Sequence, residues 1–236
     1  MILSVLMACE PAPTAPLALV YRGPAGCAGC SSAVADLLEG NNPAFDVTFV
    51  GPDDEELTEE LLATATVYAQ PGGEGTVADA FAFVKSTGGM IRDFVDGGGR
   101  YLGFCMGGYF AGFDPGFEML PGDSGQYIAS EGADVTTEID TVVPVLWGEE
   151  SRSLYFQDGP YFELDDSEAG AAAEVLATYE ATGAIAALVA PYGEGKLGVV
   201  GPHPEATEDW YTAESVSDPD GVDTDLGREL VAATLE

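Results

Sequence analysis

The sequence predicts an α/β fold in which a mostly parallel sheet is flanked by helices. Short apolar segments alternate with helical segments from Leu17 to Phe104, and this alternation is typical of parallel strands joined by crossover helices. Glycine turns or a cysteine follow directly where several of these apolar segments end. The chain of 236 residues is 46% hydrophobic, which is enough for a large buried core.

The first half of the chain supplies strands and helices in turn. Ser31 or Ser32 is expected to cap the first helix, and Gly88-Gly89 to interrupt the third. The expected strands are Leu17–Tyr21, Asp46–Val50, Ala65–Ala69 and Tyr101–Phe104. The expected helices are Ser31–Glu39, Glu55–Ala63 and a pattern over Thr76–Val95 in two pieces, the second being Met90–Asp96.

The second half has a different character. Between Phe113 and Phe162 it is rich in Gly, Asp, Val and Thr without a long helical period, which predicts loops and an antiparallel insertion around 125–162. Further on, Glu174–Tyr179 fits a helix or a strand, Ile185–Ala190 with Lys196–Val200 fits a hairpin, and Asp225–Leu235 fits an amphipathic helix. Neither an internal repeat nor linker-like composition follows Pro16, so residues 17–236 are expected to form a single domain.

The charge balance excludes one class of partner. The chain has 41 acidic and 7 basic residues, a formal net charge of −34. A nucleic-acid backbone would be repelled, so we expect no nucleic-acid binding. The acidic residues are spread along the whole chain, which suits a protein adapted to salty surroundings, where screening weakens self-repulsion.

Residues 1–16 resemble a bacterial lipoprotein signal followed by a tether. An apolar run ends at Ala8-Cys9, and the Pro-rich stretch Glu10 to Pro16 follows. On this interpretation Cys9 is lipidated, and the protein is exported and anchored to a membrane only through that lipid. The alternative is a hydrophobic tail on a cytoplasmic protein, because the run is short and lacks a positive flank. No other stretch is long and apolar enough to span a bilayer.

Cys105 is the candidate nucleophile. It follows the apolar run Tyr101–Phe104 and precedes Gly107-Gly108, which is the pattern of a sharp strand-to-helix turn that exposes a reactive side chain, a nucleophile elbow. The N-terminus of the next helix would favour the thiolate form there. The alternative is an inert core cysteine at a strand end.

His203 is the only histidine, so any cysteine–histidine chemistry must use it. It lies in Gly201-Pro202-His203-Pro204-Glu205 directly after an apolar strand, and Glu205 is close enough in sequence to orient its ring. The alternative is an ordinary turn histidine beside a solvated glutamate.

A third motif, Gln70-Pro71-Gly72-Gly73, also follows an apolar strand. Glycines there would let backbone N–H groups turn toward a neighbouring strand end and form an oxyanion hole with the N–H of Met106. The alternative is an ordinary turn. In a parallel sheet these strand ends lie along one edge, where such folds bind ligands.

Cys27-Ala28-Gly29-Cys30 follows the first strand and is expected near the same edge. If the protein is exported, a disulfide between Cys27 and Cys30 is the simplest interpretation, while inert thiols and a redox pair are the alternatives. We expect no metal site, since only Cys105 and His203 remain as soft ligands.

In combination and order, these motifs resemble class I glutamine amidotransferase-like proteins, and more narrowly the amidotransferase-like N-terminal domain of biotin-protein ligases, including its stand-alone bacterial form. The resemblance covers roughly residues 17–205. The segments that carry it are Val20–Pro24, Gln70–Gly73, Ile91–Val95 with Gly97-Gly98, Tyr101–Tyr109 and Gly201–Glu205.

The resemblance implies a flavodoxin-like three-layer fold and a Cys105–His203–Glu205 triad, with Gly72, Gly73, Met106 and Tyr109 around the substrate. It implies a cysteine hydrolase that acts on a small amide or acyl compound through a thioester, without a cofactor. Tyr109 stands near where glutaminases of the superfamily usually carry glutamine, which leaves glutamine hydrolysis in doubt and keeps a silent ligand-binding or regulatory module as the alternative. Nothing in the sequence resembles a ligase half, so biotin transfer is not expected.

Overall fold

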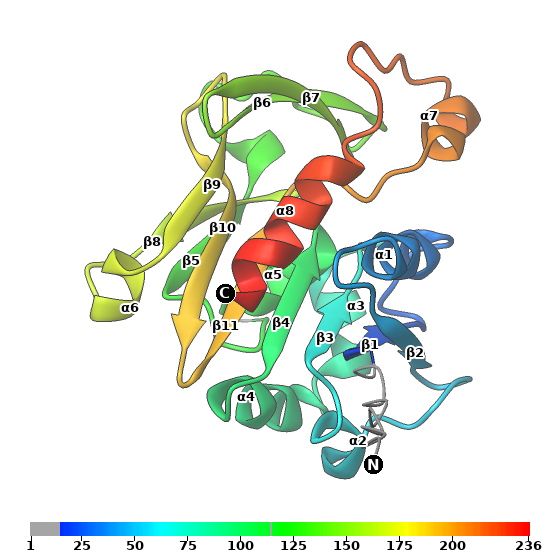
Figure 1. The fold of residues 1–236 in the computed structure, drawn as a ribbon. Helices are drawn as coiled ribbons and strands as arrows, with labels where there is room; N and C mark the ends of the chain where they lie inside the picture. Colours follow the sequence, from blue (N-terminus) through cyan, green and yellow to red (C-terminus); the bar gives the residue numbers. More distant parts are fainter. Residues whose placement is uncertain (1–14, 114) are drawn as a thin grey trace, which may run out of the picture.

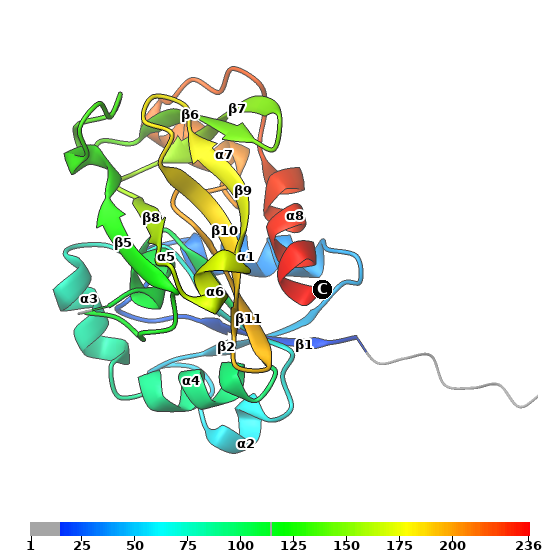
Figure 2. The ribbon, with the colours of Figure 1, turned by 90° about the vertical axis from the view of Figure 1, so that its left-hand side faces the viewer.

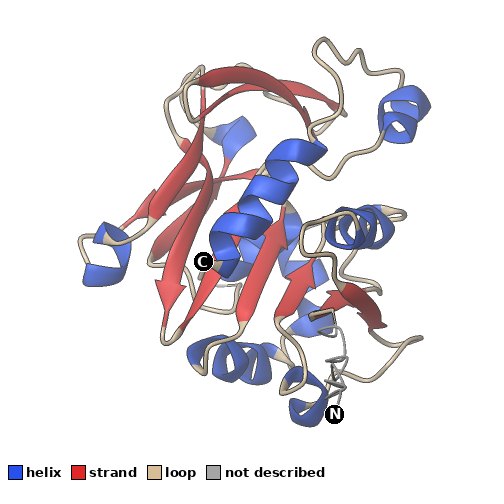
Figure 3. Ribbon diagram, in the orientation of Figure 1, coloured by secondary structure: helices blue, strands red, loops and turns tan. Residues whose placement is uncertain are grey.

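The fold is built on one mixed sheet with eleven strands. The structure is a computed structural model that describes residues 15–113 and 115–236. The main path of the sheet runs in the order β2-β1-β3-β4-β11-β10-β9-β6-β7, with β5 and β8 paired beside it (Figures 1 and 3). The strands are β1 (Leu17–Tyr21), β2 (Asp46–Val50), β3 (Val67–Gln70), β4 (Arg100–Phe104), β5 (Gly122–Gln126), β6 (Thr141–Trp147), β7 (Glu150–Phe156), β8 (Pro160–Leu164), β9 (Glu174–Tyr179), β10 (Ile185–Tyr192) and β11 (Gly195–Val200).

Helices cover both faces of the parallel part of this sheet. Figure 2 shows α8 and α3 on opposite sides of the strands. The helices are α1 (Cys30–Glu39), α2 (Glu59–Leu62), α3 (Val77–Val84), α4 (Gly88–Asp96), α5 (Met106–Ala111), α6 (Glu168–Ala171), α7 (Glu208–Glu214) and α8 (Thr224–Leu235), with a short 3₁₀ turn η1 (Tyr127–Ala129).

Two apolar cores result from the alternation of side chains along the strands. In β1, Ala18 and Val20 face a core that contains residues of α1 and α8, whereas Leu19 and Tyr21 face a core with residues of α2, α3, α4 and α5. The sheet is therefore the middle of three layers. The predicted α/β class, with mostly parallel strands, helices on both faces and an antiparallel part, is confirmed.

The parallel strands place the site motifs at one edge. β1 pairs with β2 and β3, β3 with β4, and β4 with β11, all in parallel. In this register Gln70 lies opposite Gly103, and Val200 lies opposite Phe104. The turns that follow β1, β3, β4 and β11 therefore leave the sheet at the same edge.

The antiparallel part extends the sheet beyond β11. β10 joins β11 to β9, and β9 leads to the β6–β7 hairpin. Arg152 of β7 fastens this region to the start of α8, because its guanidinium lies 2.7 Å from Asp223 and 3.0 Å from Asp225. Burial raises the pKa of Asp223 to about 7, although the nearby Arg152 opposes this shift.

Several predicted element boundaries were wrong. Gly29, in the left-handed region with φ 86°, caps α1 instead of Ser31 or Ser32; the Ser31 hydroxyl donates to the Tyr21 carbonyl. Helix α2 spans only Glu59–Leu62, because Thr58 caps it, and Gly88-Gly89 begin α4 instead of interrupting a helix.

Other elements were undecided or unexpected. Glu174–Tyr179 is a strand, and α7 was not predicted. Cys9 and its predicted lipidation lie outside the described residues. Within 15–113 and 115–236, no helix combines the length and apolar character that crossing a membrane requires.

Glycines let α5 pack closely against β3 and β4. A Cβ on Gly107 would lie 2.1 Å from the Gln70 carbonyl oxygen, and one on Gly103 would lie 2.4 Å from the Gly107 carbonyl oxygen. The Tyr101 hydroxyl also donates to the Gly107 carbonyl at 2.7 Å. No L side chain fits at these two positions without moving the backbone.

We predict that Gly107→Ala lowers the free energy of unfolding by about 3 kcal/mol or more, because the added methyl meets rigid backbone. The matched control is Gly89→Ala, also within a helix, where nothing lies within 4 Å of the added atom. It should change stability by less than about 1 kcal/mol. Urea unfolding of both variants checks this, and equal losses would contradict it.

Candidate active site

Cys105 lies on a strained turn between β4 and α5. Its backbone has φ 48° and ψ −103°, a conformation that non-glycine residues rarely adopt. The Cys105 N–H donates to the Val200 carbonyl at 2.9 Å, and its own carbonyl accepts from the N–H groups of Gly108 and Tyr109. Strained residues of this kind cluster at functional sites, and the turn has the shape of a nucleophile elbow.

The Cys105 thiol is 5% exposed and borders a cavity. Its Sγ lies 3.6 Å from the backbone carbonyl oxygen of Gln157, which belongs to the turn after β7. The thiol is therefore accessible from the cavity and held in one direction by the antiparallel part of the sheet.

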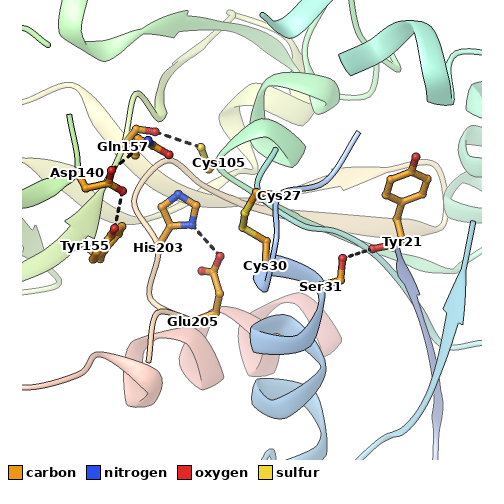
Figure 4. Close-up of a disulfide and its surroundings, with 10 residues drawn as sticks. All are labelled: Tyr21, Cys27, Cys30, Ser31, Cys105, Asp140, Tyr155, Gln157, His203 and Glu205. Carbon is orange, nitrogen blue, oxygen red and sulfur yellow. Dashed lines mark hydrogen bonds and ion pairs between the residues drawn. A yellow bond between two sulfur atoms is a disulfide. The ribbon is translucent and has the colours of Figure 1, made fainter. Parts of the chain in front are cut away.

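His203 and Glu205 form a buried pair after β11. The imidazole Nδ1 lies 2.9 Å from the Glu205 carboxylate, and the two residues are 4% and 1% exposed. The backbone N–H of His203 donates to the Tyr155 backbone carbonyl at 2.8 Å. The rings of Tyr155 and Trp210 pack edge-on against the imidazole. This packing holds the ring in one orientation, with Nδ1 toward Glu205 and Cys105 beyond the opposite side of the ring (Figure 4).

The surroundings favour the protonated form of His203. Burial opposes the charge, but Glu205 and Cys105 together outweigh it and raise the pKa of His203 to about 10. At neutral pH the ring therefore carries a proton that it can deliver to a leaving group.

The Pro71-Gly72-Gly73 turn lies against both the histidine and the elbow. A Cβ on Gly72 would lie 2.7 Å from His203 Cε1, and one on Gly73 would lie 2.9 Å from Met106 Cγ. Among the described residues, neither the Gly73 N–H nor the Met106 N–H has an acceptor. Two backbone donors beside Cys105 are thus free, as an oxyanion hole requires.

A cavity of about 720 Å³ opens in front of Cys105. Tyr109 lines it and donates its hydroxyl to the Asp158 carbonyl at 3.1 Å; burial raises the pKa of Tyr109 far above its ordinary value, so the hydroxyl stays protonated. The wall also includes the carboxylates of Glu74, Glu138 and Asp158, and no Lys or Arg among the described residues. Desolvation raises the pKa of Asp158, and Glu138 adds to this shift.

Several residues of the site were missed by the sequence analysis. Asp140 accepts hydrogen bonds from the Tyr155 hydroxyl and the Gln157 side chain, and thereby fixes the strand end that faces Cys105 (Figure 4). Trp210 comes from the unpredicted α7. The aromatic pair Trp210-Tyr211 shortly after GPHPE was the only local signal for any of them.

Cys27 and Cys30 are joined by a disulfide at the start of α1 (Figure 4). The Cys27 backbone N–H donates to the Gly72 carbonyl, so the disulfide lies beside the Pro71-Gly72-Gly73 turn. Cys105 is a free thiol. No group of three or more His, Cys, Asp or Glu side chains in the described part of the chain is arranged to hold a metal ion.

Solved structures with the same fold include two glutamine amidotransferases. The protein from Thermotoga maritima is 14% identical, with a TM-score of 0.59 and coverage of 95% of this chain and 100% of its own. The protein from Methylobacillus flagellatus is 16% identical, with a TM-score of 0.55 and coverage of 93% and 89%. An exo-β-1,4-mannosidase from an Opitutaceae bacterium is 14% identical, with a TM-score of 0.53 and coverage of 94% and 36%.

The chain therefore has the fold of these two glutamine amidotransferases. In addition, the family model described as biotin-protein ligase, N terminal, matches residues 17–125, which is less than half of the chain. The resemblance predicted from the sequence is thus confirmed. A search of curated proteins found no match.

We predict that His203 titrates with a midpoint near pH 10, and that Glu205→Gln moves the midpoint down toward the ordinary value of about 6.5 because the buried carboxylate is lost. A folded-state pKa above the unfolded value means that the pair stabilises the fold fully below about pH 6.5 and that this contribution disappears as pH rises through about 10. With one histidine in the chain, a single ring resonance in NMR reports both titrations. The same midpoint in both proteins would contradict the prediction.

Proposed function

We propose that the protein is a cysteine hydrolase of the amidotransferase type that acts on a small amide or related acyl compound. One observation carries the proposal: Cys105 stands on a strained elbow at a cavity, and the chain's single histidine is buried beside it with Glu205 2.9 Å from its Nδ1. A nucleophile, a proton carrier and an orienting carboxylate in this order are the parts of a catalytic triad.

The reaction follows from this arrangement. The Cys105 thiolate attacks the substrate carbonyl carbon, and the negative charge that develops on the oxygen is stabilised by the N–H groups of Gly73 and Met106. The carbon–nitrogen bond then breaks, and the protonated His203 gives its proton to the departing amine, leaving a thioester on Cys105. In the second half, neutral His203 removes a proton from water, the resulting hydroxide attacks the thioester, and the carbon–sulfur bond breaks. This releases a carboxylic acid and restores the Cys105 thiolate and the protonated His203.

Glu205 has a supporting role in this mechanism. It stabilises the imidazolium and keeps the Nδ1 side of the ring occupied, so the opposite side is directed at Cys105. Tyr155 and Trp210 keep the ring from turning away.

The cavity wall also bears on the substrate. A substrate with its own carboxylate, such as free glutamine, would find three carboxylates and no Lys or Arg among the lining residues described. Tyr109 stands near the position where glutaminases of the superfamily usually carry glutamine. Its hydroxyl already donates a hydrogen bond to the Asp158 carbonyl. We therefore propose a neutral or positively charged amide.

A catalytically silent ligand-binding module is the second candidate. It is favoured by Tyr109 and by the occurrence of the fold as a part of a longer chain in the mannosidase, of which this chain covers 36%. Biotin ligation is not part of either proposal.

We also propose that the protein is exported. The Cys27–Cys30 disulfide supports an oxidising compartment, as expected outside the cytoplasm. Lipidation of Cys9 would anchor the protein to a membrane surface, and mass spectrometry of the protein from a membrane fraction tests it.

We predict that iodoacetamide alkylates Cys105 rapidly at neutral pH and about 10-fold or more slowly in His203→Ala, because the imidazolium that stabilises the thiolate is lost. The measurement is site-resolved mass spectrometry against time. A panel of small amides and esters should leave an acyl mass on Cys105 in the wild type and none in Cys105→Ala. Equal, slow alkylation in both proteins, with no acyl mass, would favour the silent module.

We also predict that substrates of equal size rank by charge, with positively charged amides processed faster than neutral ones and carboxylate-bearing ones slowest. Glu138→Gln combined with Asp158→Asn should reduce the ratio of kcat/KM for positively charged amides to kcat/KM for carboxylate-bearing amides by about 10-fold. The reason is that removal of two charges weakens the negative field in the cavity. The matched control, Glu59→Gln with Glu60→Gln, removes two charges of α2, which do not line the cavity. kcat/KM at a fixed salt concentration is the measurement, and a ratio changed equally by both double variants would attribute the ranking to net charge alone.

A further inference from the structure

The Cys27–Cys30 disulfide has no part in the proposed chemistry, yet it lies against the site. We propose that this disulfide is a positioning element that holds the Gly72–Gly73 turn, and with it an oxyanion donor, in the geometry needed for acylation of Cys105. The proposal rests on the proposed function, since it assigns a role in that same reaction.

The turn is fixed from the side of the disulfide by a direct hydrogen bond. The Cys27 N–H donates to the Gly72 carbonyl oxygen at 2.9 Å. A peptide plane joins that carbonyl to the Gly73 N–H, so the bond that fixes one end of the plane also fixes the direction of the other. The Gly73 N–H is the group proposed to stabilise the oxyanion.

Gly72 is also enclosed between the disulfide and the imidazole. A Cβ at Gly72 would lie 3.3 Å from Cys30 Sγ and 2.7 Å from His203 Cε1. Cys30 is fully buried and His203 is 4% exposed, so none of the three groups has room to move independently. Figure 4 shows the disulfide next to the His203–Glu205 pair.

The next residue transmits this constraint to the elbow. A Cβ at Gly73 would lie 2.7 Å from the Ala25 carbonyl oxygen and 2.9 Å from Met106 Cγ. The turn that carries the disulfide therefore contacts one side of Gly73, and the elbow contacts the other. A displacement of about 1 Å at such a contact can cost about 100-fold in rate.

Global stability does not account for this placement. The bridge joins cysteines three positions apart, and short loops gain the least from cross-linking. The start of α1 is held separately by the Ser31 hydroxyl, which donates to the Tyr21 carbonyl at 2.8 Å. What the disulfide adds is rigidity beside Gly72.

Reduction should therefore change the site. A dithiol such as dithiothreitol cleaves the sulfur–sulfur bond, which takes up two electrons and two protons, while the reagent closes to its own cyclic disulfide. Two separate thiols need more space than a bonded pair, and the enclosed Gly72 must shift or Cys27 must move away.

The test compares two reactions of Cys105 with different demands. Acylation by p-nitrophenyl acetate needs the thiolate and the oxyanion donors, whereas alkylation by iodoacetamide needs the thiolate alone. We expect Cys27→Ser with Cys30→Ser to slow acylation about 10- to 100-fold and alkylation by less than about 3-fold. Reduction of the wild type should slow acylation equally and reversibly, and the double variant should not respond to reductant.

Ser31→Ala is the matched control, because it loosens the start of α1 without touching Gly72. Ser31→Ala should lower the melting temperature about as much as the double cysteine variant does, but should leave the acylation rate within about 3-fold of the wild type. Acylation and alkylation that fall together in the double variant, or acylation unchanged there, would overturn the proposal.

Cys105→Ala distinguishes failure of the positioning role from failure of the proposed hydrolase function. If Cys105→Ala keeps the full acylation rate, the proposed function itself fails. If Cys105→Ala abolishes acylation and the disulfide variant matches the wild type, only the positioning role fails. Unfolded protein should show two more titratable thiols after reduction than before it, which checks that the disulfide is present at the start.

Discussion

The parallel pairing of β1, β3, β4 and β11 is the constraint on which the site depends. These strands are neighbours in the sheet, and each leads into a turn at the same edge. The turns carry the disulfide, the Gly72–Gly73 pair, Cys105 and His203. Residues far apart in the sequence are thereby brought within contact distance, and the hydrogen bond from the Cys105 N–H to the Val200 carbonyl links the elbow directly to the histidine strand.

Close packing beneath Cys105 converts this alignment into a fixed geometry. Gly103 and Gly107 allow the backbone of α5 to lie against β3 and β4, where any side chain would collide with a carbonyl. The strained φ of Cys105 persists because the buried strands on both sides leave it no alternative. The glycines thus allow the close packing, and the surrounding buried strands maintain the strained turn.

Charge is handled differently at the surface and in the interior. A chain with a net charge of −34 keeps its carboxylates solvated, but Glu205 and Asp223 are buried. Each has a cationic partner, the protonated His203 for Glu205 and Arg152 for Asp223, because a buried unpaired charge is very costly. The first pair serves the proposed chemistry, and the second holds the antiparallel region that presents Gln157 and Asp158 to the cavity.

The sequence by itself determined the parallel half of the fold and the residues at its edge. Alternating apolar segments predict parallel strands, and parallel strands place their following turns together, so Cys105, His203, Glu205 and Gly73 could be grouped by a local rule. Only the tertiary structure decided the remaining wall of the site. Tyr155 belongs to the antiparallel strand β7, Asp158 to the turn between β7 and β8, and Trp210 to an unpredicted helix. The placement of these elements depends on contacts distant in sequence, and no local pattern specifies such contacts. For the same reason, the sequence offered a disulfide at Cys27 and Cys30 as one of several interpretations, whereas its contact with Gly72 and the imidazole depends on how β1, β3 and β11 assemble.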